Sequence, residues 1–319
     1  MESSSIGTAT IQELRPKTRS FVADFFIRLV KEKPLGAVGG IIFLLLLLTG
    51  IFADVISPYG YNEMNPIDRL QLPSAIHMLG TDHMGRDIFT RIVHGARLSV
   101  IVGLSATAFS IIISTFIGIT TGFIGGRYDM IVQRFVDGWM IFPGLVILIV
   151  FVSIFSPGMW TIIFILGLQY GIAGSRIVRG AAIGVKENVY VAAADAIGAK
   201  TSRILLLHIL PNIMAPIIVL FSTRIAAVIL AEATLSFLGL GIPPPAPSWG
   251  GMLSAEGRGY MLRFPYLALP PGIALTIVVF GINMFGDAMR DLLDPRLRGG
   301  IGSYSGDAKV ELFEEKTKE

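Results

Sequence analysis

Long uncharged, apolar stretches constrain this chain more than any other feature. The segment from Leu98 to Gly126 contains no Asp, Glu, Lys or Arg, and the segment from Leu35 to Ala53 is also uncharged. A helix needs about 20 predominantly apolar residues to cross a hydrocarbon layer ~30 Å thick. With 53% hydrophobic and 15% charged residues among 319, these segments exclude an ordinary soluble domain and indicate an integral membrane protein.

The apolar segments predict an all-α integral membrane protein with six transmembrane helices. Gly138 to Ser175 is uncharged over a length that suits two spans, and Ser156-Pro157-Gly158 is a turn signal between them. The first apolar segment is expected to remain as a span, because about 34 residues precede it and Asp54, Ser57 and Pro58 make a poor signal-peptide cleavage site. In order, the predicted spans are 35–53, 98–126, two within 138–175, 213–236 and 264–286.

The distribution of Lys and Arg sets the predicted orientation. These residues gather before residue 35, between residues 176 and 212, and after residue 289, so these regions and both termini are expected in the cytoplasm. The loop before the second span also carries arginines, but long loops cross a membrane largely regardless of charge. The predicted organisation is a cytoplasmic tail (1–34), a first span with its extracytoplasmic loop (35–97), a core of five spans (98–290) containing a cytoplasmic loop (176–212), and a second cytoplasmic tail (291–319).

The cytoplasmic loop is predicted to fold as a helix, a bend and a second short helix. Good helix formers from Glu187 to Ile197 include three consecutive alanines, which leave a low surface that another protein can approach. Gly198 should break this helix, and Thr201 is expected to cap a second one that ends at the Leu210-Pro211 step. An amphipathic hairpin lying on the membrane is the alternative interpretation.

The same loop carries a family resemblance. Tyr190 to Gly198, followed by His208 to Asn212, resembles the EAA loop of ATP-binding-cassette (ABC) importer permeases. The resemblance implies that the loop docks into a groove on an ATPase subunit. Ala192 stands where the family has Glu, so an ion pair made by that Glu is not assumed here. The predicted coupling residues are Glu187, Tyr190, Val191, Ala192, Ala193, Ala194, Asp195, Gly198, Leu210 and Pro211.

A second motif closes the extracytoplasmic loop and resembles the GTDxxGRD signature of the C-type subunit of dipeptide and oligopeptide permeases. Its residues here are Gly80, Thr81, Asp82, Gly85, Arg86 and Asp87. We expect the two glycines to make turns, and Arg86 to pair with Asp87 at the membrane surface. His77, His83 and His94 lie close by, but without cysteine or a zinc-like spacing they predict no metal site.

Five residues are candidates for the substrate pathway or its outer rim. Arg224 and Glu232 are charges inside the fifth span, where ionisable groups are functional candidates by default. Arg224 is expected to line the pathway or meet a carboxylate of a sister subunit, and Glu232 is expected either to act there or to hold the rim as a surface-facing carboxylate. The other candidates are Ser236 and Phe237 at the end of the span and Trp249, which suits a membrane interface.

The resemblance implies the type I importer permease fold and a set of partners. These are a sister B-type permease in a heterodimer, two ABC ATPases that carry ATP and Mg, an extracytoplasmic substrate-binding protein and the lipid membrane, with no nucleic acid. The chain itself has no phosphate-binding Gly-x-x-x-x-Gly-Lys-Ser/Thr loop and no predicted catalytic residue or cofactor, so it is not expected to be an enzyme.

The resemblance favours di- or oligopeptides as substrates, and nickel or oligosaccharides are the alternatives within the family. An ion-coupled secondary carrier would need several acidic residues near the middle of the membrane and an inverted repeat, and neither is evident. A membrane-embedded enzyme would need a catalytic constellation at that depth, and none is evident in the predicted spans.

Overall fold

The computed structural model describes residues 21–260 and 263–293, and within these residues the protein is helical, with one isolated bridge between Thr81 and Asp87 in place of strands. The predicted tails before residue 21 and after residue 293 lie outside this part. The α-helices are α1 (Phe21–Glu32), α2 (Pro34–Ile51), α3 (Ala53–Ile56), α4 (Ile88–Ile124), α5 (Gly126–Ile141), α6 (Gly144–Phe155), α7 (Met159–Lys186), α8 (Val189–Ala196), α9 (Thr201–Ile204), α10 (Met214–Phe237), α11 (Trp249–Gly251), α12 (Gly257–Tyr260) and α13 (Leu269–Leu293).

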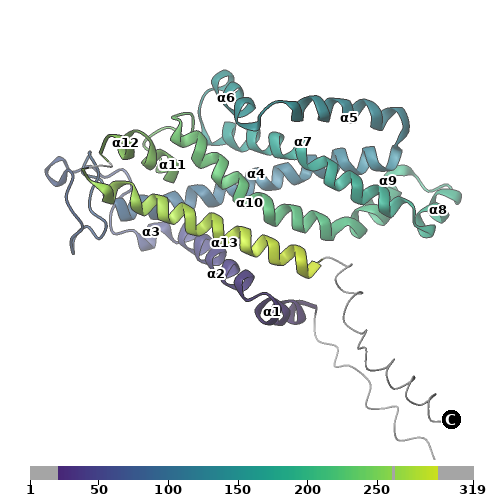
Figure 1. The fold of residues 1–319 in the computed structure, drawn as a ribbon, viewed down its shortest axis with the longest axis horizontal. Helices are drawn as coiled ribbons and strands as arrows, with labels where there is room; N and C mark the ends of the chain where they lie inside the picture. Colours follow the sequence, from purple (N-terminus) through teal and green to yellow (C-terminus); the bar gives the residue numbers. More distant parts are fainter. Residues whose placement is uncertain (1–20, 261–262, 294–319) are drawn as a thin grey trace, which may run out of the picture.

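The long helices lie side by side along the long axis of the molecule, with α4 packed against α7 and α10 (Figure 1). Small residues let these backbones approach closely, because lipid provides no hydrophobic drive for helix association. A Cβ atom on Gly118 of α4 would lie 2.6 Å from Cβ of Val178 on α7, and one on Gly103 would lie 2.9 Å from Ile229 on α10. The glycines of α4 therefore lie on faces that pack against α7 and α10.

The number of spans depends on how one bent helix pair is counted. Within the described residues, five helices are long and apolar enough to cross a membrane, and a sixth span results if α5 and α6 are taken together across their 90° bend. The predicted third span is bent in the structure, because α6 has 12 residues and reaches only about 18 Å, too short to cross a membrane alone. Pro143 lies two residues after the end of α5 and cannot donate the N–H that a continuing helix needs. The predicted turn before α7 is present at Ser156, with φ of 67°.

Two other boundaries differ from the prediction. Helix α4 begins at Ile88, well before the expected start at Leu98, because the side chain of Asp87 caps it there. Helix α7 continues to Lys186, so the first part of the predicted loop, which contains Arg176 and Arg179, is helical. Both helices thus continue beyond the apolar segments that predicted them, into sequence that contains charged residues.

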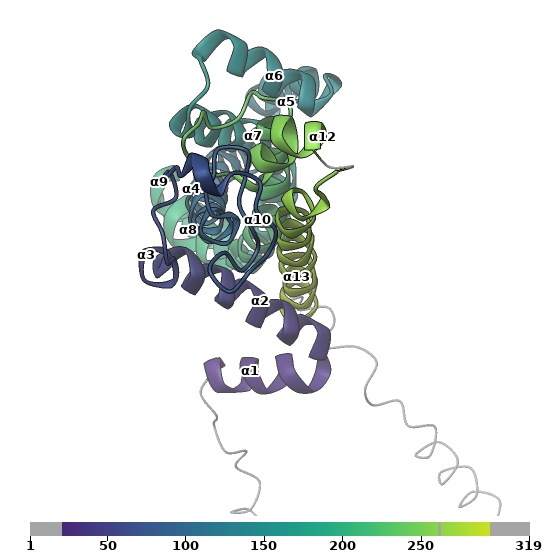
Figure 2. The ribbon, with the colours of Figure 1, turned by 90° about the vertical axis from the view of Figure 1, so that its left-hand side faces the viewer.

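The two ends of the helix bundle differ in what they carry. Helices α3, α11 and α12 and the segment between α3 and α4 lie at one end, while α8 and α9 lie at the other (Figure 1). Figure 2 looks along the long helices and shows α1 at full length, so α1 runs across their direction. The start and the end of the described chain lie beside each other, because Nζ of Lys33 lies 2.6 Å from an Asp291 oxygen.

Candidate functional site

Helix α8 is a short helix with most of its surface exposed. Val191 and Ala194 are buried and pack with Ile204 and Ile209, which hold α8 against the helices behind it. The exposed side carries small or apolar side chains, including Ala192 and Ala193, with the flanking Ile197 86% exposed. Tyr190, also exposed, and Asp195 add polar atoms to this surface. The predicted helix is confirmed, but it begins later than expected, because Glu187 ends α7.

Gly198 makes the bend after α8, as predicted. Its φ is +77°, a left-handed conformation that L side chains rarely adopt, and a Cβ atom there would meet nothing within 4 Å. The glycine is therefore required by backbone conformation and not by lack of space. Thr201 starts the next helix, with Lys200 at the N-cap position and no side-chain cap, so the expected Thr cap is wrong.

The second helix of the loop does not end at Leu210-Pro211, contrary to the prediction. The chain passes from α9 through a π-helical turn (Leu205–Ile209) and a 3-10 turn (Leu210–Ile213) into α10, which together form one span candidate from Thr201 to Phe237. Proline lacks the N–H that would bond to the preceding turn, and a locally altered helical turn accommodates this loss. Helix α9 is therefore continuous with α10 through these two turns.

A hollow of about 600 Å³ lies beside the bend at the α8 end. It is lined by Gly198, Ala199, Lys200, Ser202, Arg203, Leu206 and Leu207. The side chains of Leu206 and Leu207 in this lining are 61% and 60% exposed. The loop thus presents an exposed apolar helix flanked by two cations, which is a surface suited to another protein.

The motif at the opposite end is a buried network of charge-assisted hydrogen bonds. Asp82 accepts from the backbone N–H of Met84 at 2.8 Å and of Arg86 at 3.0 Å, and from Nε of Arg86 at 2.6 Å. Asp87 accepts from the backbone N–H of Thr90 at 2.8 Å and so caps α4. The predicted Arg86–Asp87 pair is wrong, since Arg86 pairs with Asp82 and both are buried.

Turns and a histidine complete this network. Gly80 and Gly85 have φ of 80° and 75°, which confirms the predicted turns. The Thr81 hydroxyl accepts from the backbone N–H of Gln71 at 2.9 Å, and Nδ1 of the buried His77 lies 3.0 Å from an Asp87 oxygen. Among the residues that the structure describes, no three His, Cys, Asp or Glu side chains are placed to hold a metal ion.

Trp249 lies inside the protein and not at a membrane interface as predicted. It is 2% exposed, and its Nε1 donates a hydrogen bond to the carbonyl oxygen of Ile92 on α4 at 3.0 Å. A Cβ atom on Gly95 would lie 2.7 Å from its ring, so glycine is what allows the indole to pack there. Trp249 therefore anchors the segment after α10 to α4.

The carboxylate of Glu232 is also buried, so the expected surface-facing role is wrong. Glu232 is 1% exposed, and its Oε1 accepts a hydrogen bond from the hydroxyl of Ser236, which is itself buried, at 2.7 Å. Phe237, the last residue of α10, is 36% exposed. Glu232 and Ser236 thus form a contact within one helix turn and do not form a rim together with Trp249.

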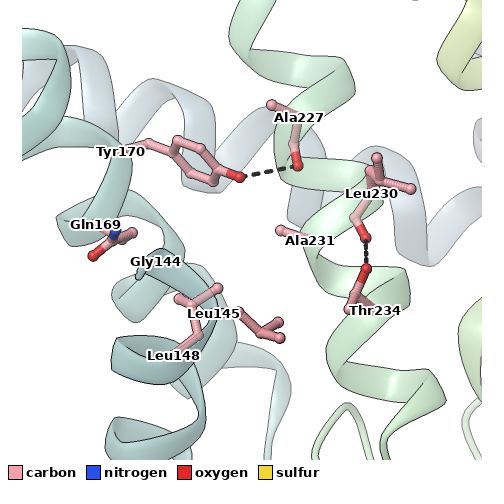
Figure 3. A pocket seen from close by; sticks show the side chains of 9 residues that line it. All are labelled: Gly144, Leu145, Leu148, Gln169, Tyr170, Ala227, Leu230, Ala231 and Thr234. Atoms are coloured by element: carbon pink, nitrogen blue, oxygen red, sulfur yellow. Dashed lines mark hydrogen bonds between the residues drawn. The ribbon is translucent and has the colours of Figure 1, made fainter. Parts of the chain in front are cut away.

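A hollow between α6, α7 and α10 was not predicted; we call it the inner hollow (Figure 3). Its volume is about 320 Å³, and it is mostly apolar. Its lining residues are Gly144, Leu145, Leu148, Gln169, Tyr170, Ala227, Leu230, Ala231 and Thr234. Leu145 and Leu230 at its edge are 42% and 48% exposed, so the hollow opens to the outside of this chain.

Three polar contacts organise the inner hollow. The Tyr170 hydroxyl donates to the carbonyl oxygen of Ala227 at 3.3 Å, as Figure 3 shows, and Trp139 Nε1 donates to Oε1 of Gln169 at 2.9 Å. The guanidinium carbon of Arg224 lies 5.3 Å from the centre of the Tyr170 ring. Gln169 is the only side-chain amide in the uncharged sequence from Gly138 to Ser175, a signal that could have identified it.

Two known protein families and several known proteins are similar to this chain. Residues 114–299 match the family described as binding-protein-dependent transport system inner membrane component, and residues 20–73 match the N-terminal TM domain of oligopeptide transport permease C. The chain is 41% identical over 269 residues to the dipeptide transport system permease protein DppC of Alkalihalophilus pseudofirmus, covering 84% of this chain and 88% of the relative.

Two further relatives and one solved structure extend the comparison. The oligopeptide transport system permease protein OppC of Bacillus subtilis is 38% identical, covering 93% of this chain and 97% of its own. The glutathione transport system permease protein GsiD of Pectobacterium atrosepticum is 36% identical, covering 91% and 96%. A chain from inward-facing structures of the MetNI methionine ABC transporter aligns with a TM-score of 0.52 at 17% identity, covering 64% of this chain and 96% of that chain, which shows a shared fold.

Proposed function

Since the chain belongs to the family of binding-protein-dependent transport system inner membrane components, we propose that it is a permease subunit of an ATP-driven peptide importer. The observation that carries this proposal is the exposed face of α8 followed by the left-handed Gly198. It is a docking surface joined through α9 to the span that lines the inner hollow. The chain has the parts needed to receive a mechanical input and to change a membrane pathway.

The chain supplies half of the pathway. Its inner hollow is formed by α6, α7 and α10 and opens to the outside of the chain, so a second subunit is needed to enclose a passage. A sister B-type permease in a heterodimer is the partner that fits this need. Arg224, beside Tyr170, lies on the pathway side of α10, whereas Glu232, Ser236 and Trp249 are structural supports of the outer half.

Energy enters at the α8 end. We assign the exposed faces of Tyr190, Ala192 and Ala193 to contact with an ABC ATPase, and two such ATPases, carrying ATP and Mg, serve the permease pair. The absence of the motif Glu at Ala192 is consistent with a largely apolar contact. An extracytoplasmic binding protein delivers substrate at the opposite end, near the motif from Gly80 to Asp87, and the permease pair resides in the cell inner membrane.

Peptides are the substrate class that the relatives support. The three named above transport a dipeptide, an oligopeptide and glutathione according to their names. A mostly apolar hollow with a few polar groups suits a flexible backbone with variable side chains. Import of nickel or oligosaccharides, and ion-coupled transport, have no comparable support in the described residues or in these relatives.

Co-purification from detergent or nanodiscs tests the proposal. The wild-type chain should recover a second permease and the ATPases, and Gly198→Pro should lose the ATPases while keeping the sister permease, because proline cannot adopt a positive φ. Thr201→Pro is the matched control, since it places proline at the first position of α9, after Lys200, whose ψ of 140° is already extended. Recovery of the wild-type chain without ATPases in several detergents would refute the proposed function.

A further inference from the structure

Arg224 continues the row of residues on α10 that lines the inner hollow. Ala227, Ala231 and Thr234 line the hollow, and Arg224 precedes them by three, seven and ten residues on the same helix. At 3.6 residues per turn these four positions fall within about 80° of one another around the helix. Arg224 therefore lies on the hollow-facing side of α10, one turn nearer to the α8 end.

The surroundings of Arg224 differ from those of other arginines in the helix bundle. Arg97, Arg176 and Arg179 each contact an aspartate side chain. Arg224 has its guanidinium over the Tyr170 ring, and within residues 21–260 and 263–293 no carboxylate lies within 4.0 Å of it. A charge at this depth requires water or an anionic partner, and arginine stays protonated under all ordinary conditions. The aromatic ring orients the cation, and among the described residues its N–H groups donate to no acceptor.

The neighbouring side chains are held in place. The hydroxyl of Tyr170 is bonded to the carbonyl oxygen of Ala227, which fixes the ring under the guanidinium. Gln169 uses its Oε1 to accept from Trp139, so its amide N–H₂ group is left as a donor at the edge of the hollow. Two kinds of hydrogen-bond donor, one of them cationic, thus flank a mostly apolar hollow.

We propose that Arg224, supported by Tyr170 and assisted by the Gln169 amide, receives the C-terminal carboxylate of a peptide as it passes through the pathway. A planar guanidinium binds a carboxylate through two parallel hydrogen bonds, whereas it repels a peptide's amino terminus. The apolar part of the hollow accepts side chains of varied shape. This inference rests on the proposed function and adds which chemical group of the substrate the pathway recognises.

Uptake into proteoliposomes that contain the whole importer tests the inference. The probes are trialanine and trialanine amide, which differ in the terminal carboxylate. Their affinities for the binding protein are measured separately, and uptake is then compared at saturating loaded binding protein, so that the rates report the permease. Arg224→Met should lower trialanine uptake by roughly tenfold, the effect of one charge-assisted hydrogen bond, and change uptake of the amide by less than about twofold.

Two variants serve as controls. Arg224→Lys keeps the charge but lacks the planar pair of N–H donors, so it should retain only part of the preference for the carboxylate. Arg134→Met removes a cation whose side chain is 81% exposed on α5, outside the inner hollow, and should leave both rates unchanged. Equal loss of both probes in Arg224→Met, or no loss of either, would overturn the inference while leaving the proposed function intact.

The same preparations distinguish a sister-subunit partner. If Arg224 instead pairs with a carboxylate of the second permease, Arg224→Met will reduce recovery of that permease, and this result would also overturn the inference. Wild-type recovery of the sister permease and ATPases, combined with selective loss of trialanine uptake, is the expected result. Failure of the wild-type importer to take up either probe would count against peptide transport itself.

Discussion

Helix α8 exposes most of its side chains, whereas the segment from Asp82 to Arg91 at the opposite end buries its charges. At the α8 end, Val189 and Ile197 are 83% and 86% exposed. At the other end, Arg86 and Asp82 are 2% and 3% exposed and bonded to each other. The apolar surface of the first region is available for a partner to cover, while the charges of the second region are already paired within this chain. Substitutions at the two ends should therefore have different consequences.

The largest effect on stability is expected from Asp82→Ala. The substitution removes the carboxylate partner of the buried Arg86 and the acceptor of two backbone N–H groups, at a cost of roughly 3–5 kcal/mol. Thermal unfolding of the purified chain measures it. Asp195→Ala on α8 is the matched control, since Asp195 is exposed and its loss should leave the unfolding temperature nearly unchanged. Equal shifts of the unfolding temperature in the two variants would contradict this difference between the two ends.

Ala193→Glu should have the reverse pattern. A carboxylate placed in the centre of the docking surface would be buried without a partner in the complex, at a cost of roughly 2 kcal/mol or about thirtyfold in affinity for the ATPases. The unfolding temperature of the isolated chain should not change, because Ala193 is exposed. Asn62→Glu adds the same charge at an exposed position at the opposite end and should leave ATPase binding intact. Tight ATPase binding by Ala193→Glu would place the contact elsewhere.

A smaller loss of about 1 kcal/mol is expected from Trp249→Phe, which removes the hydrogen bond to Ile92 but keeps an aromatic ring beside Gly95. Trp160→Phe is the control, because Trp160 is 73% exposed. The unfolding temperatures of the two variants distinguish a buried aromatic anchor from an exposed aromatic side chain. A loss in Trp160→Phe as large as that in Trp249→Phe would argue against the anchor.

The smallest effect is the pH dependence of stability that comes from the ion pair between Asp54 and Arg97, whose side chains are 73% and 31% exposed. Hydrogen bonds donated by Arg97 hold the pKa of Asp54 below its ordinary value. A carboxyl group with a lowered folded-state pKa stabilises the protein above its unfolded-state value of about 3.9, and this contribution disappears as the pH falls through the folded-state pKa. The difference in unfolding temperature between wild type and Asp54→Asn should thus be small at neutral pH and vanish on acidification. A difference that grows in acid would contradict the assigned sign.

Much of the arrangement could be predicted from local chemistry. Uncharged segments located four of the long helices, because transfer of apolar side chains out of water depends on each residue and its immediate neighbours. Gly80, Gly85 and Gly198 were predicted as turns or bends, and all three have positive φ. The exposed face of α8 also followed from its run of alanines. These features need no knowledge of distant residues.

Other features depended on which helices meet. Arg86 pairs with Asp82 and not with the adjacent Asp87, because Asp87 caps α4 and its side chain is turned toward Thr90 and His77. Trp249 is buried because Gly95 on α4 leaves room for its ring. The capping role of Asp87 had a local signal, since Asp is a preferred N-cap residue. The place of Trp249 had none in the neighbouring sequence.

By itself the sequence determined the membrane class, the position of the apolar segments, the glycine bends and the family. The burial of Glu232 and the position of Arg224 over Tyr170 beside a hollow follow only from the way the helices pack. The physical reason is the distance along the sequence over which each interaction acts. Transfer from water and backbone conformation act on single residues and their neighbours, whereas ion pairing, ring contacts and cavities arise where residues distant in the chain are packed together.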